Sequence, residues 1–303
     1  MDVREALLDT TARLTQAGIP DARIDAEYLV AAASGIPRTR MLIKLDRALS
    51  LDGEILLRQW TIERLERRPL AYVLGEQPFL DLTLRVNPSV LIPRPETELV
   101  VEEACRILGR MDRAVVVDVG TGSGNIALSL ANHEQAAEVH AIDISPAALG
   151  VARENALRNA VKKPIRWHQG DLLSPLIPLG VRADLIVANL PYVRRDELPA
   201  LAPEVRWEPV LALDGGRDGL AYIFQLLDQA SYVLKRGGVL LLEIGADQGP
   251  DVLDRLTSKP WKNAELYSDL AGLPRIVKAQ SAAQSLADPP EPQWRKGNTR
   301  WIS

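Results

Sequence analysis

An Asn-Leu-Pro-Tyr turn at residues 189–192 follows the apolar, β-branched stretch at residues 183–188. The side-chain carbonyl of Asn189 and the backbone carbonyl of Leu190 can each accept a hydrogen bond, and Tyr192 offers a flat aromatic face. Such a site suits a planar NH2 group, as carried by amides and aromatic amines. Because the lone pair of that nitrogen is delocalised, the site must hold both N–H groups and aim the nitrogen at an electrophile. The alternative is an ordinary turn in which Asn189 only caps nearby backbone.

A glycine-rich turn stands upstream, between the strand-like run at residues 114–119 and an apolar helical pattern that begins near residue 125. Gly120, Gly122 and Gly124 allow a ligand to approach the backbone closely, and the helix behind them offers free N–H groups and a positive dipole end. The spacing G-x-G-x-G differs from the G-x-G-x-x-G of dinucleotide sites, which disfavours a pyrophosphate ligand. We expect this turn to bind a nucleoside-containing ligand.

Two further strand-like segments end in ligand-type residues. The segment at 138–143 ends in Asp143, about where a carboxylate would bind ribose hydroxyls. The segment at 165–170 is followed by Asp171 and Leu172, a pair suited to the exocyclic amine and the face of an adenine. Four successive strand ends would therefore meet at one rim of a parallel sheet. In this order, with Asn189 at the fourth, they resemble a class I methyltransferase that uses S-adenosylmethionine.

The chain divides into four segments by pattern. Residues 1–73 read as helices with apolar faces and form an expected substrate-recognition domain. Residues 74–93 alternate like a β-hairpin turning at Asn87-Pro88 and would connect the domains. Strands and helices alternate over 94–280, as in a Rossmann-like doubly wound sheet. The polar, proline-rich tail at 281–303 is expected to lack fixed structure, with Trp294 and Trp301 as its only candidate anchors.

Composition narrows the class of protein further. The 303 residues include 36 basic and 40 acidic side chains, and a net charge of −4 argues against tight, sequence-blind binding of nucleic acid. The single cysteine, Cys105, cannot form an internal disulfide, and no apolar run reaches membrane-spanning length. His133, His140 and His168 lack metal-ligand spacing, so no metal is expected. We expect a cytoplasmic protein.

Several longer motifs are similar to one family, the HemK/PrmC glutamine N5-methyltransferases. They are LIPRPETE at 91–98, GTGSG at 120–124, DLLSP at 171–175 and EPVLALDGGRDGL at 208–220. The resemblance covers the chain up to about Gln280. It implies a class I methyltransferase fold with a small N-terminal helical domain. It also implies transfer of a methyl group from S-adenosylmethionine to the glutamine side-chain amide in the Gly-Gly-Gln motif of class 1 peptide chain release factors, which would be its protein partners.

We expect three groups of site residues. The amide-binding group is Asn189, Leu190, Pro191 and Tyr192. The cofactor-binding group is Gly120, Thr121, Gly122, Ser123, Gly124, Asp143, Ile144, Asp171, Leu172 and Asn189. The substrate-side candidates are Arg94, Glu96 and Thr97, although Thr97 also suits an ordinary helix start. Asp118 is expected to support the glycine loop. Leu190 stands where the resembled family usually has proline, but leucine supplies the same backbone carbonyl.

Other functions fit parts of the same pattern. An N6-adenine methyltransferase on RNA or DNA would use the same grip on a base amine, although such enzymes usually bring basic surface with them. A glutamine of a ribosomal protein is a second possible substrate. A non-catalytic adapter that binds S-adenosylmethionine is disfavoured, because it would have no need of the amide-binding turn at 189–192.

Overall fold

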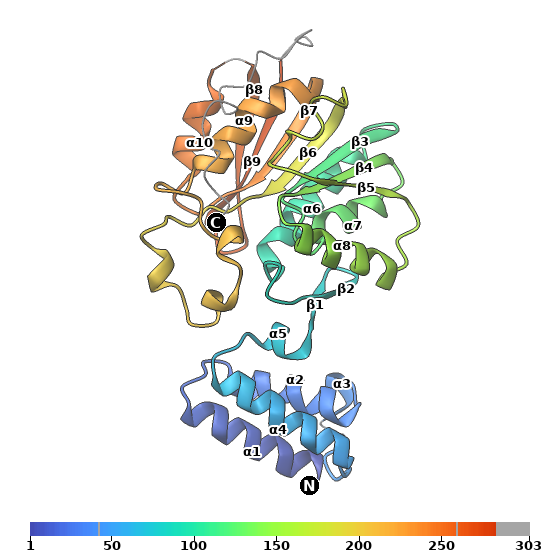
Figure 1. Cartoon of the computed structure of the whole chain (residues 1–303), viewed down its shortest axis with the longest axis vertical. Helices are drawn as coiled ribbons and strands as arrows, with labels where there is room; N and C mark the ends of the chain where they lie inside the picture. Colours follow the sequence, from blue (N-terminus) through green and yellow to red (C-terminus); the bar gives the residue numbers. More distant parts are fainter. Residues whose placement is uncertain (42, 259, 283–303) are drawn as a thin grey trace.

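The computed structural model describes residues 1–41, 43–258 and 260–282, so the tail expected at 281–303 lies almost wholly outside the described residues. A helical domain is joined by a small hairpin to a larger domain built on a central sheet (Figure 1). The helical domain is the lower, blue part of Figure 1. The helical, hairpin and α/β segments follow one another in this order along the chain.

Five helices form the N-terminal domain: α1 Val3–Gln16, α2 Ala22–Ser34, α3 Arg38–Met41, α4 Leu51–Leu65 and α5 Leu70–Leu74. The start of α1 is a capping box, in which Asp2 accepts from the backbone N–H of Glu5 and Glu5 accepts from that of Asp2. Gly35 ends α2 in the left-handed conformation that glycine tolerates. Leu14, Leu29 and other apolar side chains from these helices form a separate buried core, so this domain has its own packing.

The connector is a hairpin of β1 Glu76–Phe79 and β2 Leu82–Arg85. Its turn is Leu80-Asp81, whereas the sequence had suggested a turn at Asn87-Pro88. Leu80 has a φ of 50°, a conformation that leucine rarely adopts, so the residue type did not mark this turn. Residues 86–94 form turn and coil instead of the second strand, where Pro88 has no N–H to pair.

The central sheet in the described part of the chain has seven strands in the order β5-β4-β3-β6-β7-β9-β8. Pairing is parallel from β5 to β7, and β9 is antiparallel to both of its neighbours. The strands are β3 Ala114–Val119, β4 Ala136–Asp143, β5 Ile165–Gln169, β6 Ala183–Asn189, β7 Leu234–Glu243, β8 Trp261–Ser268 and β9 Pro274–Ser281. The doubly wound α/β fold predicted from the alternation is confirmed.

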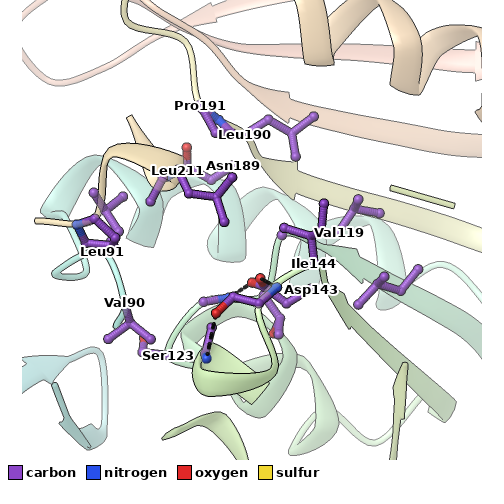
Figure 2. A pocket seen from close by; sticks show the side chains of 18 of the residues that line it. Val90, Leu91, Val119, Ser123, Asp143, Ile144, Asn189, Leu190, Pro191 and Leu211 are labelled. Carbon is purple, nitrogen blue, oxygen red and sulfur yellow. Dashed lines mark hydrogen bonds between the residues drawn. The ribbon is translucent and has the colours of Figure 1, made fainter. Parts of the chain in front are cut away.

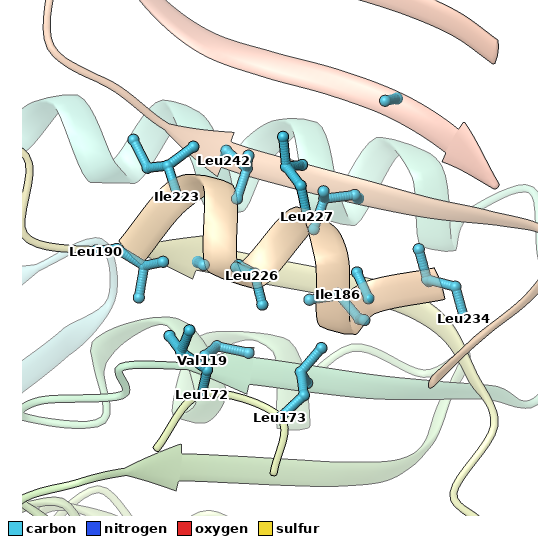
Figure 3. Packing of buried hydrophobic residues seen from close by; sticks show 14 of the residues in the cluster. Val119, Leu172, Leu173, Ile186, Leu190, Ile223, Leu226, Leu227, Leu234 and Leu242 are labelled. Atoms are coloured by element: carbon cyan, nitrogen blue, oxygen red, sulfur yellow. The ribbon is translucent and has the colours of Figure 1, made fainter. Parts of the chain in front are cut away.

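Helices cover both faces of this sheet. They are α6 Pro95–Leu108, α7 Asn125–Ala131, α8 Pro146–Arg158, α9 Ala221–Val233 and α10 Gly249–Leu256. Alternate residues of β6 enter two different cores: Ile186 packs with α9 (Figure 3), whereas Leu185 belongs to the core that includes α6 and α7. This two-sided burial explains why the strands read as nearly continuous apolar runs.

The strand order reverses at β3, because the chain goes to β4 on one side and later to β6 on the other. In open α/β sheets the carboxyl ends of the strands at such a reversal leave a crevice that binds ligands. Residues 190–220, which follow β6, contain only three short 3-10 helices, Leu198–Ala200, Val205–Trp207 and Val210–Ala212. This long segment borders the crevice and also contacts the helical domain.

Candidate active site

A cavity lies at the carboxyl ends of β3, β4 and β6 (Figure 2). It contains about 1090 Å³ of empty space, part of which is open solvent. Most residues expected from the sequence line it: Arg94, Thr97, Gly120, Thr121, Gly122, Ser123, Asp143, Ile144, Asp171, Leu172, Asn189, Leu190 and Pro191. The described residues Glu96, Gly124 and Tyr192 are not among the lining residues. The fold therefore brings together segments that lie up to a hundred residues apart.

The glycine turn is held by hydrogen bonds to the neighbouring strand. The backbone N–H groups of Gly120 and Thr121 both donate to the carbonyl of Ile142, at 2.9 Å each. Gly120 and Gly122 have φ values of 74° and 55°, which glycine adopts without strain. Gly124 also has a positive φ, 87°, and in addition a Cβ there would lie 3.2 Å from Ala152 Cβ, so this glycine also allows helix packing behind the turn.

Asp143 ties the glycine turn to the next helix. Its Oδ2 accepts from the N–H of Gly122 at 2.8 Å, and its Oδ1 accepts from the N–H of Ser145 at 2.9 Å. Burial raises the pKa of this carboxyl group, and the bonds from backbone N–H groups act in the opposite direction. Each carboxylate oxygen can accept more than one hydrogen bond, so Asp143 can still accept from ligand hydroxyl groups.

Asp118 lies buried beneath the same turn. Its Oδ2 accepts from Thr121 Oγ1 at 2.6 Å and from the N–H of Ala127 at 3.0 Å. Its Oδ1 has no hydrogen-bond partner in the described ranges, and burial raises the pKa of the carboxyl group to about 7. These contacts are those of a residue that supports the glycine loop from below.

Asp171 and Leu172 follow the end of β5 and lie on the cavity wall. Asp171 Oδ2 accepts from Gln225 Nε2 at 3.1 Å, which fixes the carboxylate. Leu172 is buried and has a φ of 48°, so the backbone turns sharply where this side chain meets the cavity. A charged acceptor beside an apolar surface is an arrangement that suits an aromatic base with an exocyclic amine.

The turn at 189–192, expected to bind an amide, is held by hydrogen bonds that link three side chains. Asn189 Nδ2 donates to Thr97 Oγ1 at 3.1 Å, and Thr97 Oγ1 donates to Glu243 Oε2 at 2.7 Å. The hydrogen bond to Thr97 uses only the Asn189 amide nitrogen, and no hydrogen bond between described residues uses Oδ1, which remains available as an acceptor at the cavity. Tyr192 packs against the α9 core, and burial is the main cause that raises its pKa.

Two glutamates at the site were not expected from the sequence. Glu243, at the end of β7, is 1% exposed, and burial raises its pKa to about 7. Glu208 is 3% exposed; its Oε2 accepts from the N–H of Ile92 at 2.9 Å and its Oε1 pairs with Arg94. The signal for Glu243 was present, because an acidic residue ends the apolar run of β7 just as Asp143 ends β4. Glu208 is the first residue of the motif at 208–220. No local pattern in the sequence indicates that this acidic side chain lies at the site.

The three histidines and Cys105 are not among the residues that line the cavity. Described residues contain no group of three or more His, Cys, Asp or Glu side chains placed to hold a metal ion. His140 Nδ1 and His168 Nε2 lie 2.9 Å apart on neighbouring strands, so these two histidines contact each other. Cys105 is partly buried, and burial raises the pKa of its thiol. None of the helices in the described ranges has the length and apolar character needed to cross a membrane.

A solved structure with a similar fold is a methyltransferase from Pyrococcus furiosus. It aligns with a TM-score of 0.50 at 17% identity and covers 68% of this chain and 91% of its own. At this identity the likeness concerns the fold alone.

Sequence comparisons give a closer relationship. Residues 5–75 match the family described as PrmC N-terminal domain, and residues 116–207 match a methyltransferase domain. A release factor glutamine methyltransferase from Moorella thermoacetica is 43% identical over 92% of this chain and 98% of the relative. Enzymes of the same name from Deinococcus radiodurans and Bacillus subtilis are 38% and 37% identical, covering 93% and 91% of this chain and 99% and 96% of the relatives. The chain belongs to the release factor glutamine methyltransferase family.

Proposed function

We propose that this protein transfers a methyl group from S-adenosylmethionine to the side-chain amide nitrogen of the glutamine in the Gly-Gly-Gln motif of class 1 peptide chain release factors. The observation that carries the proposal is the free Oδ1 of Asn189 at the cavity, beside the backbone of Leu190. Two adjacent acceptors match the two N–H groups of a primary amide. Membership of the family supports the choice of a release factor as the substrate.

The cavity lining fits S-adenosylmethionine by its chemistry. Asp143 can accept hydrogen bonds from ribose hydroxyls, while Asp171 and Leu172 can hold the adenine. Ser123 Oγ is buried at the lining and has no partner within the described ranges, so it offers one more polar contact. Gly120 and Gly122 let the ligand approach the backbone. The cofactor supplies a methyl group bonded to a positively charged sulfur, which makes that carbon electrophilic.

The protein's own contribution to the reaction is orientation. Asn189 Oδ1 and the Leu190 carbonyl accept the two N–H bonds of the glutamine amide, which fixes the plane of the NH2 group and directs its nitrogen. During transfer, positive charge develops on that nitrogen, and the same two oxygens stabilise it. Pro191 limits the freedom of the turn that carries them.

No catalytic base is required in this scheme. A methylated, positively charged amide nitrogen is strongly acidic and can release its proton to water. The side chains that contact the proposed amide position therefore bind and orient it, and none of them has to remove a proton before transfer.

The charge of the chain bears on the competing substrates. Methylation of adenine would use the same pair of acceptors, but the net charge of −4 gives no general attraction for nucleic acid. We therefore propose that the protein has no high-affinity nucleic-acid partner, and that it meets its substrate in the cytoplasm, where translation takes place.

The experiment is a methylation assay with the full-length protein and labelled S-adenosylmethionine. Separate reactions contain intact class 1 release factor, the same factor with the Gly-Gly-Gln glutamine changed to alanine, ribosomal RNA, and ribosomal proteins. We expect label only on the intact release factor, and peptide mass spectrometry should place it on that glutamine. Label on adenine or on a ribosomal protein alone would contradict the proposal.

A further inference from the structure

The three hydrogen-bonded side chains that hold the amide-binding turn come from three separate elements. Asn189 ends β6, Glu243 ends β7 and Thr97 lies in the first turn of α6. Asn189 and Glu243 are register partners on adjacent parallel strands, and Thr97 bridges them. Thr97 and Glu243 are each 1% exposed, so the hydrogen bond between them is shielded from water, whereas the bond from Asn189 to Thr97 is partly buried.

We propose that Glu243 is a positioning residue for methyl transfer, which acts through Thr97 to hold the Asn189 amide with its oxygen toward the substrate. The inference rests on the proposed function, because it assigns a role to Glu243 in the same reaction. Glu243 is not among the residues that line the cavity, so its effect must pass through its neighbours.

The direction of each hydrogen bond in this chain decides which end of the Asn189 amide faces the cavity. An ionised carboxylate can only accept, and a threonine hydroxyl has one proton to donate. When that proton goes to Glu243, the Thr97 oxygen faces Asn189 as an acceptor and selects the NH2 group of the asparagine. Asn189 Oδ1 then remains for the substrate. The carboxylate thus determines which end of a nearly symmetrical amide faces the cavity.

A neutral Glu243 would remove this selection. Its own proton could be donated to Thr97, and the hydroxyl could then donate to Asn189 Oδ1 with the amide turned over. The Asn189 NH2 group would then face the NH2 group of the substrate glutamine, and two donors cannot form a hydrogen bond. Loss of the charge on Glu243 is therefore expected to lower the rate of transfer without removing any atom from the cavity wall.

The charged groups around Glu243 leave its ionisation sensitive to pH near neutrality. Burial raises its pKa to about 7, Glu96 acts in the same direction, and the Thr97 hydrogen bond, Arg275 and Arg94 act against it. Tyr192 is the other titratable neighbour, and Glu243 contributes to the raised pKa of its hydroxyl. The ionised, selecting form of Glu243 therefore gains population as the pH rises through about 7.

The test compares Glu243→Gln, Thr97→Val and Thr97→Ser with the unchanged protein. Single-turnover methylation of intact release factor is measured at saturating substrate from pH 6 to 9, and cofactor affinity by calorimetry. We expect Glu243→Gln and Thr97→Val to lose about ten-fold or more in rate while cofactor affinity changes less than about three-fold, because the positioned acceptor acts mainly in the transition state. Thr97→Ser keeps the hydroxyl and should stay within about three-fold of the unchanged rate.

The pH profile separates positioning from a structural role. The unchanged protein should become faster as the pH rises through about 7, and Glu243→Gln should lose that rise. Glu103→Gln is the matched control, because Glu103 is also buried in this domain but pairs with Arg106 and Lys278, away from the cavity. This control should keep both the rate and the profile.

Three results would overturn the inference in different ways. If the unchanged protein methylates release factor and folded Glu243→Gln has the same rate and pH profile, Glu243 does not position Asn189. Equal losses in Thr97→Ser and Thr97→Val would likewise show that Thr97 serves packing alone. A complete lack of release factor methylation by the unchanged protein would instead refute the proposed function, and the inference with it.

Discussion

Arg64 of the helical domain donates from a terminal guanidinium nitrogen to Glu204 Oε1 of the catalytic domain, at 3.0 Å. Arg64 is 5% exposed and also pairs with the buried Asp25 at 2.7 Å, whereas the contact with Glu204 is partly buried. Arg67 donates to the other oxygen of Glu204 at 2.9 Å. Glu204 precedes Glu208 and the wall residue Leu211 by only a few positions, so the helical domain is linked to one side of the cavity.

Glu204→Gln should weaken the use of release factor and spare the cofactor. The substitution removes the negative charge that pairs with Arg64 and Arg67, so the segment at 204–212 is less firmly placed beside Arg94, the proposed substrate-side residue of the cavity. We expect KM for intact release factor to rise several-fold, consistent with about 1 kcal/mol for a partly buried ion pair. Calorimetry should show cofactor affinity unchanged within about three-fold. The control is Glu197→Gln, since Glu197 lies outside 204–212 but in the same longer segment at 190–220, and its side chain is 55% exposed. Equal KM values for the Glu204 and Glu197 variants would show that the network does not support substrate binding.

Asp143→Ala should lower affinity for S-adenosylmethionine by about ten-fold or more. A hydrogen bond to a charged group contributes roughly 1.5–3 kcal/mol, and Asp143 is the proposed acceptor for the ribose hydroxyls. The substitution also removes the acceptor for the N–H groups of Gly122 and Ser145, which adds to the loss. Calorimetric titration of the folded variant is the measurement. Unchanged affinity would exclude Asp143 from the cofactor site.

Asn189→Ala should affect the chemical step far more than cofactor binding. The substitution removes one of two proposed acceptors for the glutamine amide, and loss of a comparable positioned group costs about 10²–10³ in rate. Single-turnover methylation of release factor should show this loss, and calorimetry should show cofactor affinity within a few-fold of the unchanged protein. Asn132→Ala, at an exposed position at the end of α7, is the control. A rate for Asn189→Ala equal to that of Asn132→Ala would mean that Asn189 is a turn residue only.

The cavity residues that can be predicted from the sequence are those whose immediate neighbours in the chain indicate a strand end or a turn. Asp143 and Asn189 each end an apolar run, and parallel strands bring such ends to one rim without further information. Gly120, Gly122 and Gly124 looked equivalent as letters, yet only the first two line the cavity. The third shares their positive φ but faces Ala152 and Leu128 behind the turn, and such packing cannot be read from spacing.

The residues that sequence reasoning missed act over long separations. Glu243 meets Thr97 across 146 positions, and Arg94 meets Glu208 across 114. In the first pair the start of α6 packs on the end of β7, and in the second the residue before α6 meets the loop after a 3-10 helix, so no local periodicity predicts either contact. The predicted position of the hairpin turn is wrong for the opposite reason. Asn87-Pro88 has the residue types of a turn, whereas the turn at Leu80 uses a conformation that its residue type disfavours.

Asp118→Asn should change how stability depends on pH. Burial raises the pKa of this carboxyl group to about 7 in the folded protein, well above its ordinary value of 3.8. The folded state therefore binds more protons than the unfolded state between these values, and stability must fall as the pH rises through that window, by up to about 1.4 kcal/mol per pH unit. Asparagine can keep both hydrogen bonds, because Thr121 and Ala127 donate to the same oxygen.

The measurement is the free energy of unfolding by urea for both proteins from pH 4 to pH 8. The difference between them isolates Asp118, since the other titrating groups are shared. We expect the asparagine variant to gain stability relative to the unchanged protein as the pH rises across this range. A difference that stays constant with pH would show that Asp118 ionises in the folded protein near its ordinary pKa.

Leu190→Pro should keep methyl transfer and lose stability. The proposed acceptor at this position is the backbone carbonyl, which proline retains, so single-turnover rates on release factor should stay within about three-fold. The leucine side chain, however, is 4% exposed and packs in the core that includes Ile223 and Leu226 (Figure 3). Its Cδ2 also covers Gly120, where an added Cβ would lie 3.2 Å away. Loss of these contacts outweighs the roughly 0.4–1 kcal/mol that proline gains by restricting the unfolded chain, so unfolding should require about 1–3 kcal/mol less.

Leu190→Ala separates the two effects of this substitution, because it removes the packed side chain without restricting the backbone. The free energy of unfolding in urea should be highest for the unchanged protein, lower for Leu190→Pro and lowest for Leu190→Ala. All three proteins should methylate release factor. A Leu190→Pro variant that folds but no longer methylates release factor would show that the turn needs a freedom that proline removes. If the unchanged protein then methylates adenine in ribosomal RNA, Leu190 marks a different substrate and the proposed function is wrong.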